Sequence, residues 1–169
     1  MLVAFKEELK RLAADPNDKF HSKVKARVGK KATRILETRL KQMILLTPSL
    51  LRRIQFHWQD ESADARIKKL GGFVFAYLYN PKDFLSEDEH GLYGYLDDAY
   101  LVINIYERVL QGAANLSEED RDFLEKISHS KKYMKALIPD ETQKIEKMVE
   151  SALNGEGFEK FSAAFQGAA

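Results

Sequence analysis

Apolar residues recur at intervals of three and four positions along most of this chain, and runs that alternate apolar and polar residues are nearly absent. The three-to-four-residue interval places apolar side chains along one face of an α-helix, whereas a half-buried strand needs an interval of two. With 169 residues, 44% of them hydrophobic and 31% charged, the chain has the length and composition of one globular domain. The sequence therefore predicts a single compact all-α domain over residues 1–169.

Prolines, glycines and capping residues divide this pattern into separate helices. Gly29 is expected to bend or break the second helix. The side chains of Thr47 and Ser62 are expected to cap the helices that follow them, and Ser117 with Asp120 has the spacing of a capping box. The predicted helices span residues 2–14, 16–47, 48–58, 63–79, 95–110, 117–128 and 139–153.

The helices predicted over residues 63–79 and 95–110 are apolar on more than one face, which is typical of central helices. They are expected to form a central antiparallel hairpin, with Asp83, Asp97 and Asp98 at its connecting end. The sequence thus predicts that this hairpin organises the domain.

Small and aromatic residues in the same region indicate close packing. Gly71 and Gly72 would let a neighbouring backbone approach closely. The aromatic side chains are expected in the core rather than on a stacking surface; they are Phe73, Phe75, Tyr77, Tyr79, Tyr93, Tyr95, Tyr100 and Tyr106. A short C-terminal helix is predicted to dock on the core, or in a homodimer, through Phe158, Phe161 and Phe165.

Composition excludes several kinds of site. The chain has no cysteine, so disulfides, thiolate metal ligands and cysteine nucleophiles are ruled out.

The N-terminal stretch carries charges at short intervals and lacks the apolar core of a signal peptide. The longest uncharged run, residues 70–81, is shorter than the ~20 residues that span a bilayer. We expect a cytoplasmic location, with peripheral attachment to a membrane as the alternative.

The net charge of +1 conceals a division of charge along the chain. Residues 1–70 hold 17 Lys and Arg against 8 Asp and Glu, a balance of +9, whereas residues 71–125 hold 3 against 12, a balance of −9. This division favours internal pairing between the two regions over separate charged partners.

Nine of the cations fall between residues 19 and 41, where Glu37 is the only acid. Wound as one helix, this stretch would direct a narrow stripe of Phe20, Val24 and Val28 inward and the cations outward. The apolar positions that continue the pattern are Ile35, Leu36, Leu40, Met43 and Leu46.

Such a helix would suit a polyanion, either nucleic acid or an anionic membrane surface. The predicted binding residues are Lys19, Lys23, Lys25, Arg27, Lys30, Lys31 and Arg34. The favoured interpretation is a solvated helix that pairs in part with the acidic region 83–98, because no nucleic-acid-binding motif accompanies the cations.

Asp97 and Asp98 stand together at the head of an apolar run. Near a helix N-terminus they would face unpaired backbone N–H groups and the positive end of the helix dipole, and one of them would also accept bonds from the preceding loop. The alternative is a metal or acid/base site of Asp83, His90, Asp97 and Asp98. Adjacent helical residues diverge by about 100°, which disfavours joint chelation by Asp97 and Asp98.

Other candidate motifs are weaker. Glu87 and His90 have the Glu-x-x-His spacing of di-iron bundles, but those sites need two such motifs and two further glutamates. His21, His57 and His129 have no ligand spacing, and the chain contains no phosphate-binding or nucleophile motif. No cofactor is therefore expected, and the sequence favours a non-catalytic protein over an enzyme.

The run AYLYNPKDF…GLYGYLDDAYLV, residues 76–102, resembles the YkvA-like domain of unknown function. In that small helical bacterial domain, a Pro-x-Asp turn and a short loop precede Gly-Tyr-Leu-Asp-Asp at the start of the next helix. The intervening loop here, LSEDEHG, is more acidic than in the family and lacks its prolines. The resemblance covers about residues 71–110 and implies a helical hairpin of undefined activity. The matching residues are Pro81, Asp83, Gly94, Tyr95, Leu96, Asp97 and Asp98.

The leading functional interpretation is an interaction or regulatory module that binds an unidentified protein partner through its surface, with a homodimer as one form. Polyanion binding through the 19–41 helix is the alternative. A metal-dependent enzyme that uses Asp83, His90 and Asp97 has the least support.

Overall fold

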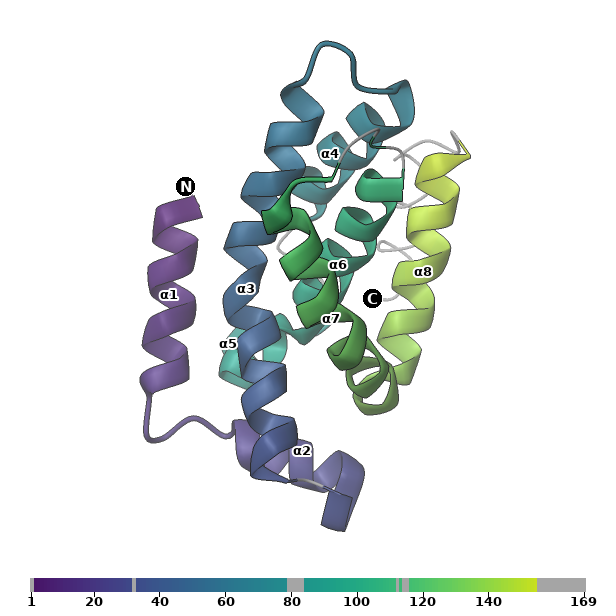
Figure 1. The fold of residues 1–169 in the computed structure, drawn as a ribbon. Helices are drawn as coiled ribbons and strands as arrows, with labels where there is room; N and C mark the ends of the chain where they lie inside the picture. The colour runs from purple at the N-terminus through teal and green to yellow at the C-terminus, as the bar shows by residue number, and fades with distance from the viewer. Residues whose placement is uncertain (1, 32, 79–83, 112, 114–115, 155–169) are drawn as a thin grey trace.

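The computed structural model describes residues 2–31, 33–78, 84–111, 113 and 116–154 (Figure 1). Within these residues there is no strand, which confirms the predicted all-α class. The α-helices are α1 (Leu2–Ala14), α2 (Phe20–Val28), α3 (Arg34–Gln59), α4 (Ala65–Leu78), α5 (Glu87–His90), α6 (Leu96–Gln111), α7 (Glu118–Leu137) and α8 (Pro139–Leu153). Two 3₁₀ helices are η1 (Gly29–Lys31) and η2 (Gly91–Tyr95).

The long helices run alternately up and down, and α6 lies at their centre (Figure 1). Helices α3, α4, α7 and α8 surround α6, whereas α1 lies outside, against α3 and η2. The short elements α2, η1, α5 and η2 gather at one end of the bundle (Figure 1). No helix within the described ranges combines the length and the apolar character needed to cross a lipid bilayer.

Helix α6 is buried at 13 of its 16 positions, because its apolar residues lie on more than one face. It forms the predicted antiparallel hairpin with α4, which precedes it (Figure 1). Helix α4 buries the side that faces α3, α6 and α8, while Lys68 and Lys69 on its other side are exposed. The fully buried Tyr100 and Tyr106 are among the largest side chains of the core, whereas Phe75 and Tyr95 are half-buried and Tyr79 lies outside the described residues.

Helix α3 continues through Pro48, so the prediction of separate helices before and after Thr47 is wrong. Pro48 has no N–H to donate within the helix, which ordinarily disrupts an interior turn. Its ring is buried, and the buried stripe continues on both sides of it, from Leu40 to Ile54. The Thr47 hydroxyl donates to the Met43 carbonyl at 3.3 Å instead of capping a new helix. Packing against α6 therefore outweighs the local effect of the proline.

Two further boundaries differ from the prediction. Helix α7 extends to Leu137 rather than Ser128, because Ile127, Met134 and Leu137 continue its buried stripe. At the start of α4, the carboxylate of Asp64 accepts the Arg66 N–H at 2.7 Å, while Ser62 donates to Asp60. The predicted cap Ser62 is therefore replaced by Asp64.

Candidate functional site

The basic stretch of the sequence folds into a corner between α2 and α3. Gly29 ends α2 with a φ of 57°, in the left-handed region that other residues rarely adopt. After η1, Thr33 caps α3, and its hydroxyl accepts the Leu36 N–H at 3.2 Å. Helix α2 itself begins at Phe20, whose N–H donates to the Asp18 carboxylate at 2.9 Å. The break at Gly29 that the sequence suggested is therefore present, and it divides the segment predicted over residues 16–47 into α2 and α3.

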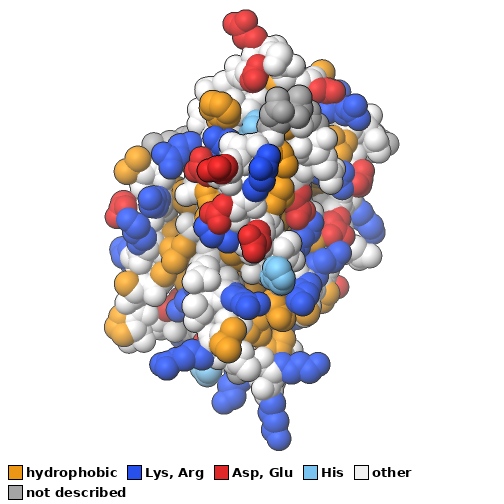
Figure 2. All heavy atoms as spheres, in the orientation of Figure 1, with side chains coloured by type: hydrophobic (Ala, Val, Ile, Leu, Met, Phe, Trp, Pro, Cys, Tyr) orange, Lys and Arg blue, Asp and Glu red, His pale blue; other side chains and the backbone are white. Residues whose placement is uncertain are grey.

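Six exposed cations project from this corner and form what we call the basic tip: Lys19, Lys25, Arg27, Lys30, Lys31 and Arg34. Figure 2 shows Lys and Arg side chains projecting from the lower end of the molecule, where α2 and the start of α3 lie. None of the six forms an ion pair with a carboxylate of the described residues. The nearby acid Glu37 is held by the His21 ring, with Oε1 2.7 Å from Nδ1. The tip therefore carries positive charge that the described part of the chain leaves unbalanced.

Two other cations of the basic stretch, Lys23 and Lys41, have structural partners. The Nζ of Lys23 lies 2.6 Å from Nδ1 of His90 and 5.9 Å from the centre of the Tyr93 ring. The Nζ of Lys41 lies 5.2 Å from the centre of the buried Phe20 ring. We therefore place Lys23, although predicted to bind polyanions, in the contact between α2 and α5 and outside the basic tip.

Ile35, in the first turn of α3, is 69% exposed beside Arg34. The helical spacing had placed it on the apolar face with Leu36 and Leu40. The buried stripe of α3 runs instead through Leu40, Met43 and Ile44, and Ile35 lies outside it. A large apolar side chain thus accompanies the cations of the tip, and the sequence pattern gave no signal of its exposure.

Asp97 is fully buried and faces back toward the segment that precedes α5. Its Oδ2 accepts the N–H groups of Phe84 and Leu85, at 3.2 and 3.1 Å. Asp97 and Asp98 lie in the first turn of α6, as the sequence predicted, but η2 runs directly into that turn, so this helix end is not free. Asp97 also fixes the approach of the chain to α5, which confirms the prediction that one of the two carboxylates accepts bonds from the preceding loop.

Close packing explains another residue of the same motif. A methyl group on Gly94 would lie 2.7 Å from Cα of Glu87, so the backbones of η2 and α5 approach too closely for a larger residue. Leu96 is fully buried, and the Tyr95 ring packs 5.8 Å from the Phe5 ring of α1. Pro81 and Asp83 lie outside the described residues.

The side chains proposed for a metal site do not converge in the part of the chain that the structure describes. No three Asp, Glu or His side chains of these residues group as metal ligands. His90 contacts Lys23, and Asp97 binds the backbone of the segment before α5. The Glu87–His90 pair occupies the single turn of α5.

A second polar cluster joins α3, α6 and α7, and its long-range partners had no signal in the sequence. Asp120 forms the predicted capping box with Ser117 and also binds Arg53 and the Tyr106 hydroxyl. Burial raises the pKa of Asp120, but hydrogen bonds from Arg53, Ser117 and Tyr106 outweigh burial and hold that pKa well below its ordinary value. His57 Nε2 lies 3.5 Å from the same carboxylate. These groups stabilise the helix packing and leave no free nucleophile with a base beside it.

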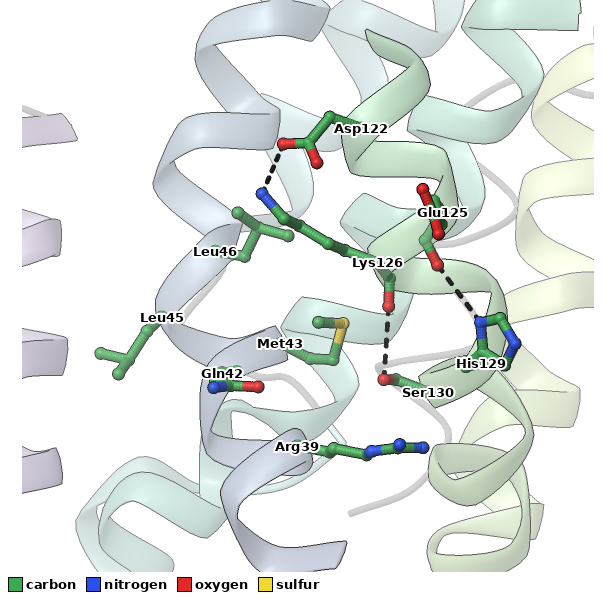
Figure 3. A pocket seen from close by; sticks show the side chains of 10 residues that line it. All are labelled: Arg39, Gln42, Met43, Leu45, Leu46, Asp122, Glu125, Lys126, His129 and Ser130. Atoms are coloured by element: carbon green, nitrogen blue, oxygen red, sulfur yellow. Dashed lines mark hydrogen bonds and ion pairs between the residues drawn. The ribbon is translucent and has the colours of Figure 1, made fainter. Parts of the chain in front are cut away.

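A groove of about 680 Å³ lies between α3 and α7 (Figure 3). Met43 and Leu46 of α3 supply apolar surface, and α7 lines the other side with charged and polar side chains (Figure 3). Lys126 forms an ion pair with Asp122, and His129 Nδ1 lies 3.4 Å from the Glu125 carbonyl oxygen. The groove mixes both signs of charge, which disfavours a polyanion as its occupant.

Comparison of the chain with models of known families, with curated proteins and with solved structures finds no match. The resemblance to the YkvA-like domain stays a prediction from residues 71–110.

Proposed function

We propose that this protein is a non-catalytic interaction module that binds a polyanionic partner through the basic tip. The observation that carries the proposal is the gathering of six exposed cations on one corner, with no ion pair to a described carboxylate. Like charges held together repel one another, and phosphate groups placed against them would relieve that repulsion. Negative charge is thus the property by which the tip would recognise its partner.

The expected strength follows from the number of cations. A Lys or Arg near an anionic surface contributes about 1 kcal/mol at physiological ionic strength. On nucleic acid, each phosphate contact releases about 0.9 of a counterion, so six contacts give a log–log salt slope of about −5. The six cations together would contribute about 6 kcal/mol to the free energy of binding at physiological ionic strength, and more at low salt. We therefore expect micromolar binding at low salt without any pocket.

Other functions have less support from the described residues. The metal-dependent enzyme would need Asp97 and His90, which are engaged with the backbone before α5 and with Lys23. Asp120 is likewise engaged with Arg53 and Tyr106. The YkvA-like resemblance supports a helical hairpin and supplies no reaction.

A protein partner, or self-association as a homodimer, is a second candidate function. Phe56 of α3 is 62% exposed, and the Arg53 guanidinium lies 4.8 Å from the centre of its ring. An aromatic ring held at the surface is typical of protein interfaces. Light scattering of wild type and Phe56→Ser tests this candidate, since only self-association through Phe56 predicts a loss of dimer in the variant.

Retention on immobilised heparin, a generic polyanion, tests the leading proposal. We expect the wild type to bind at low salt and a variant with Lys30→Gln, Lys31→Gln and Arg34→Gln to elute at a clearly lower salt concentration. A matched control replaces three exposed cations distant from the tip, Arg52, Arg66 and Lys69, by Gln. Equal shifts in the two triple variants would mean that net charge, rather than the tip, governs binding.

A further inference from the structure

The basic tip combines cations with exposed apolar surface. Ile35 is 69% exposed directly after Arg34, while Val28 at the end of α2 and Leu36 in the first turn of α3 are half-buried. The exposure of an isoleucine side chain to water is unfavourable in free energy, and phosphate groups cannot bury its apolar surface. A partner that suits the whole tip must therefore supply an apolar layer directly beneath its negative charges.

We infer that the polyanion is an anionic lipid surface, on which the bundle stands end-on with Ile35 inserted between the headgroups. This inference rests on the proposed function and adds the class of the partner. Lipid headgroups present phosphate and carboxylate groups in a plane, with acyl chains a few ångströms below. The six cations contact the layer of headgroups, and Ile35 reaches the acyl chains below it.

The shape of the bundle suits this orientation. The corner of α2, η1 and α3 projects beyond the neighbouring elements at the lower end of Figure 1, so a flat surface can reach it without obstruction. The 26-residue helix α3 begins at this corner, and the positive end of its dipole points the same way as the cations. Charge, shape and the apolar group therefore agree on one contact face.

Nucleic acid suits the tip less well. Proteins that bind single strands stack bases on exposed aromatic rings, and those that read a duplex insert polar side chains into a groove. Phe20 and Tyr93, which contact cations of α2 and α3, are 0% and 4% exposed, and the exposed ring of His21 is held by Glu37. Several of the uncharged polar residues exposed near this corner, such as Ser22, Thr33 and Thr38, have short side chains.

Vesicle flotation of the full chain tests the inference, with phosphatidylcholine vesicles and vesicles of phosphatidylcholine mixed with phosphatidylserine. We expect binding to the mixed vesicles alone. Removing the charges of Lys30, Lys31 and Arg34 lowers the affinity for the mixed vesicles by about fivefold per charge, on the order of 100-fold in all. Ile35→Ser weakens it by about tenfold while retention on heparin is unchanged. Val3→Ser, at a side chain 75% exposed on the distant end of α1, is the matched control and has no effect.

Insertion can be observed directly because the chain has no cysteine. Ile35→Cys and Val3→Cys each carry a single environment-sensitive fluorophore, and we expect mixed vesicles to shift the emission to the blue only at position 35. An unshifted label at position 35, with Ile35→Ser binding as tightly as wild type, overturns the inference.

The two levels of the proposal fail separately. Wild type that binds heparin or a DNA duplex but not the mixed vesicles overturns the lipid inference and leaves the polyanion function in place. Wild type that binds none of the three at low salt overturns both.

Discussion

Arg53 of α3 and Asp120 of α7 form a two-point ion pair between positions 67 residues apart in the sequence. Nε of Arg53 lies 3.0 Å from Oδ1 of Asp120, and a terminal nitrogen lies 2.7 Å from Oδ2. Tyr106 of α6 donates to Oδ1 at 2.7 Å. The Asp120 side chain is 1% exposed, so one buried carboxylate links three helices.

Arg53→Met is expected to lower the free energy of unfolding by about 3 kcal/mol, because it leaves the buried Asp120 charge without its main partner. Ser117 and Tyr106 still donate to Asp120, which places the loss at the lower end of the usual range. Urea unfolding followed by circular dichroism measures it. Arg52→Met, at the exposed neighbouring position, should change stability by no more than about 0.5 kcal/mol. Equal effects in the two variants would contradict a specific role for the ion pair.

The stability contributed by Asp120 should depend on pH. Its pKa is lowered in the folded protein, so its contribution is complete above the unfolded pKa of about 3.9 and declines as the pH falls below that value toward the folded pKa. We expect the stability difference between wild type and Asp120→Asn to be constant from about pH 7 to pH 5 and to narrow below about pH 4. A difference that stays constant down to about pH 3 would show that the charge of Asp120 is not the source of the stabilisation.

Asp97→Ala should release the segment before α5, since it removes the acceptor of the Phe84 and Leu85 N–H groups. Leaving these groups without the carboxylate is expected to cost about 3 kcal/mol. Hydrogen exchange should accelerate at the amides of Phe84 and Leu85. Asp88→Ala, at an exposed carboxylate of α5, serves as the control. Protected amides in Asp97→Ala would mean that other contacts hold this segment.

Two adjacent glycines of α4 should respond to alanine with opposite signs. A methyl group on Gly71 would lie 2.7 Å from Cγ of Trp58, and overpacking of this kind costs about 1–3 kcal/mol. Nothing lies within 4 Å of the corresponding position on Gly72, where alanine should stabilise the helix by about 0.5–1 kcal/mol. Thermal unfolding monitored by the fluorescence of Trp58, the single tryptophan, distinguishes the two. A shift of the same sign in both variants would contradict the packing of Gly71 against Trp58.

The predictable parts of the fold depend on residues close together in sequence. Ser117 and Asp120 are three residues apart, so their capping box was visible as a pattern and is present. The apolar residues of α6 lie on more than one face of the helix, which indicated its central place. Pro48 was misinterpreted because its local rule favours a helix start, whereas burial against the core keeps α3 continuous.

The candidate site was only half visible in the sequence. The run of cations is a local feature, but the contact of Lys23 with His90 joins positions 67 residues apart and has no signature along the chain. The exposure of Ile35 depends on the direction in which α3 leaves the corner at Gly29. The run of cations therefore predicted a basic surface, and only the three-dimensional arrangement separates the cations of the tip from Lys23, which contacts His90.

The burial of α6 has a consequence for the newly made chain on the ribosome. Among the described helices, α3 packs most extensively against α6, yet α4 and α5 are synthesised between them. Until residues 96–111 emerge, the apolar stripe of α3 lacks its main cover, and such surface attracts chaperones or other nascent chains. Translation that stalls before α6 should therefore yield aggregation-prone, protease-sensitive fragments. Once α8 has been released, the surrounding helices can pack around α6.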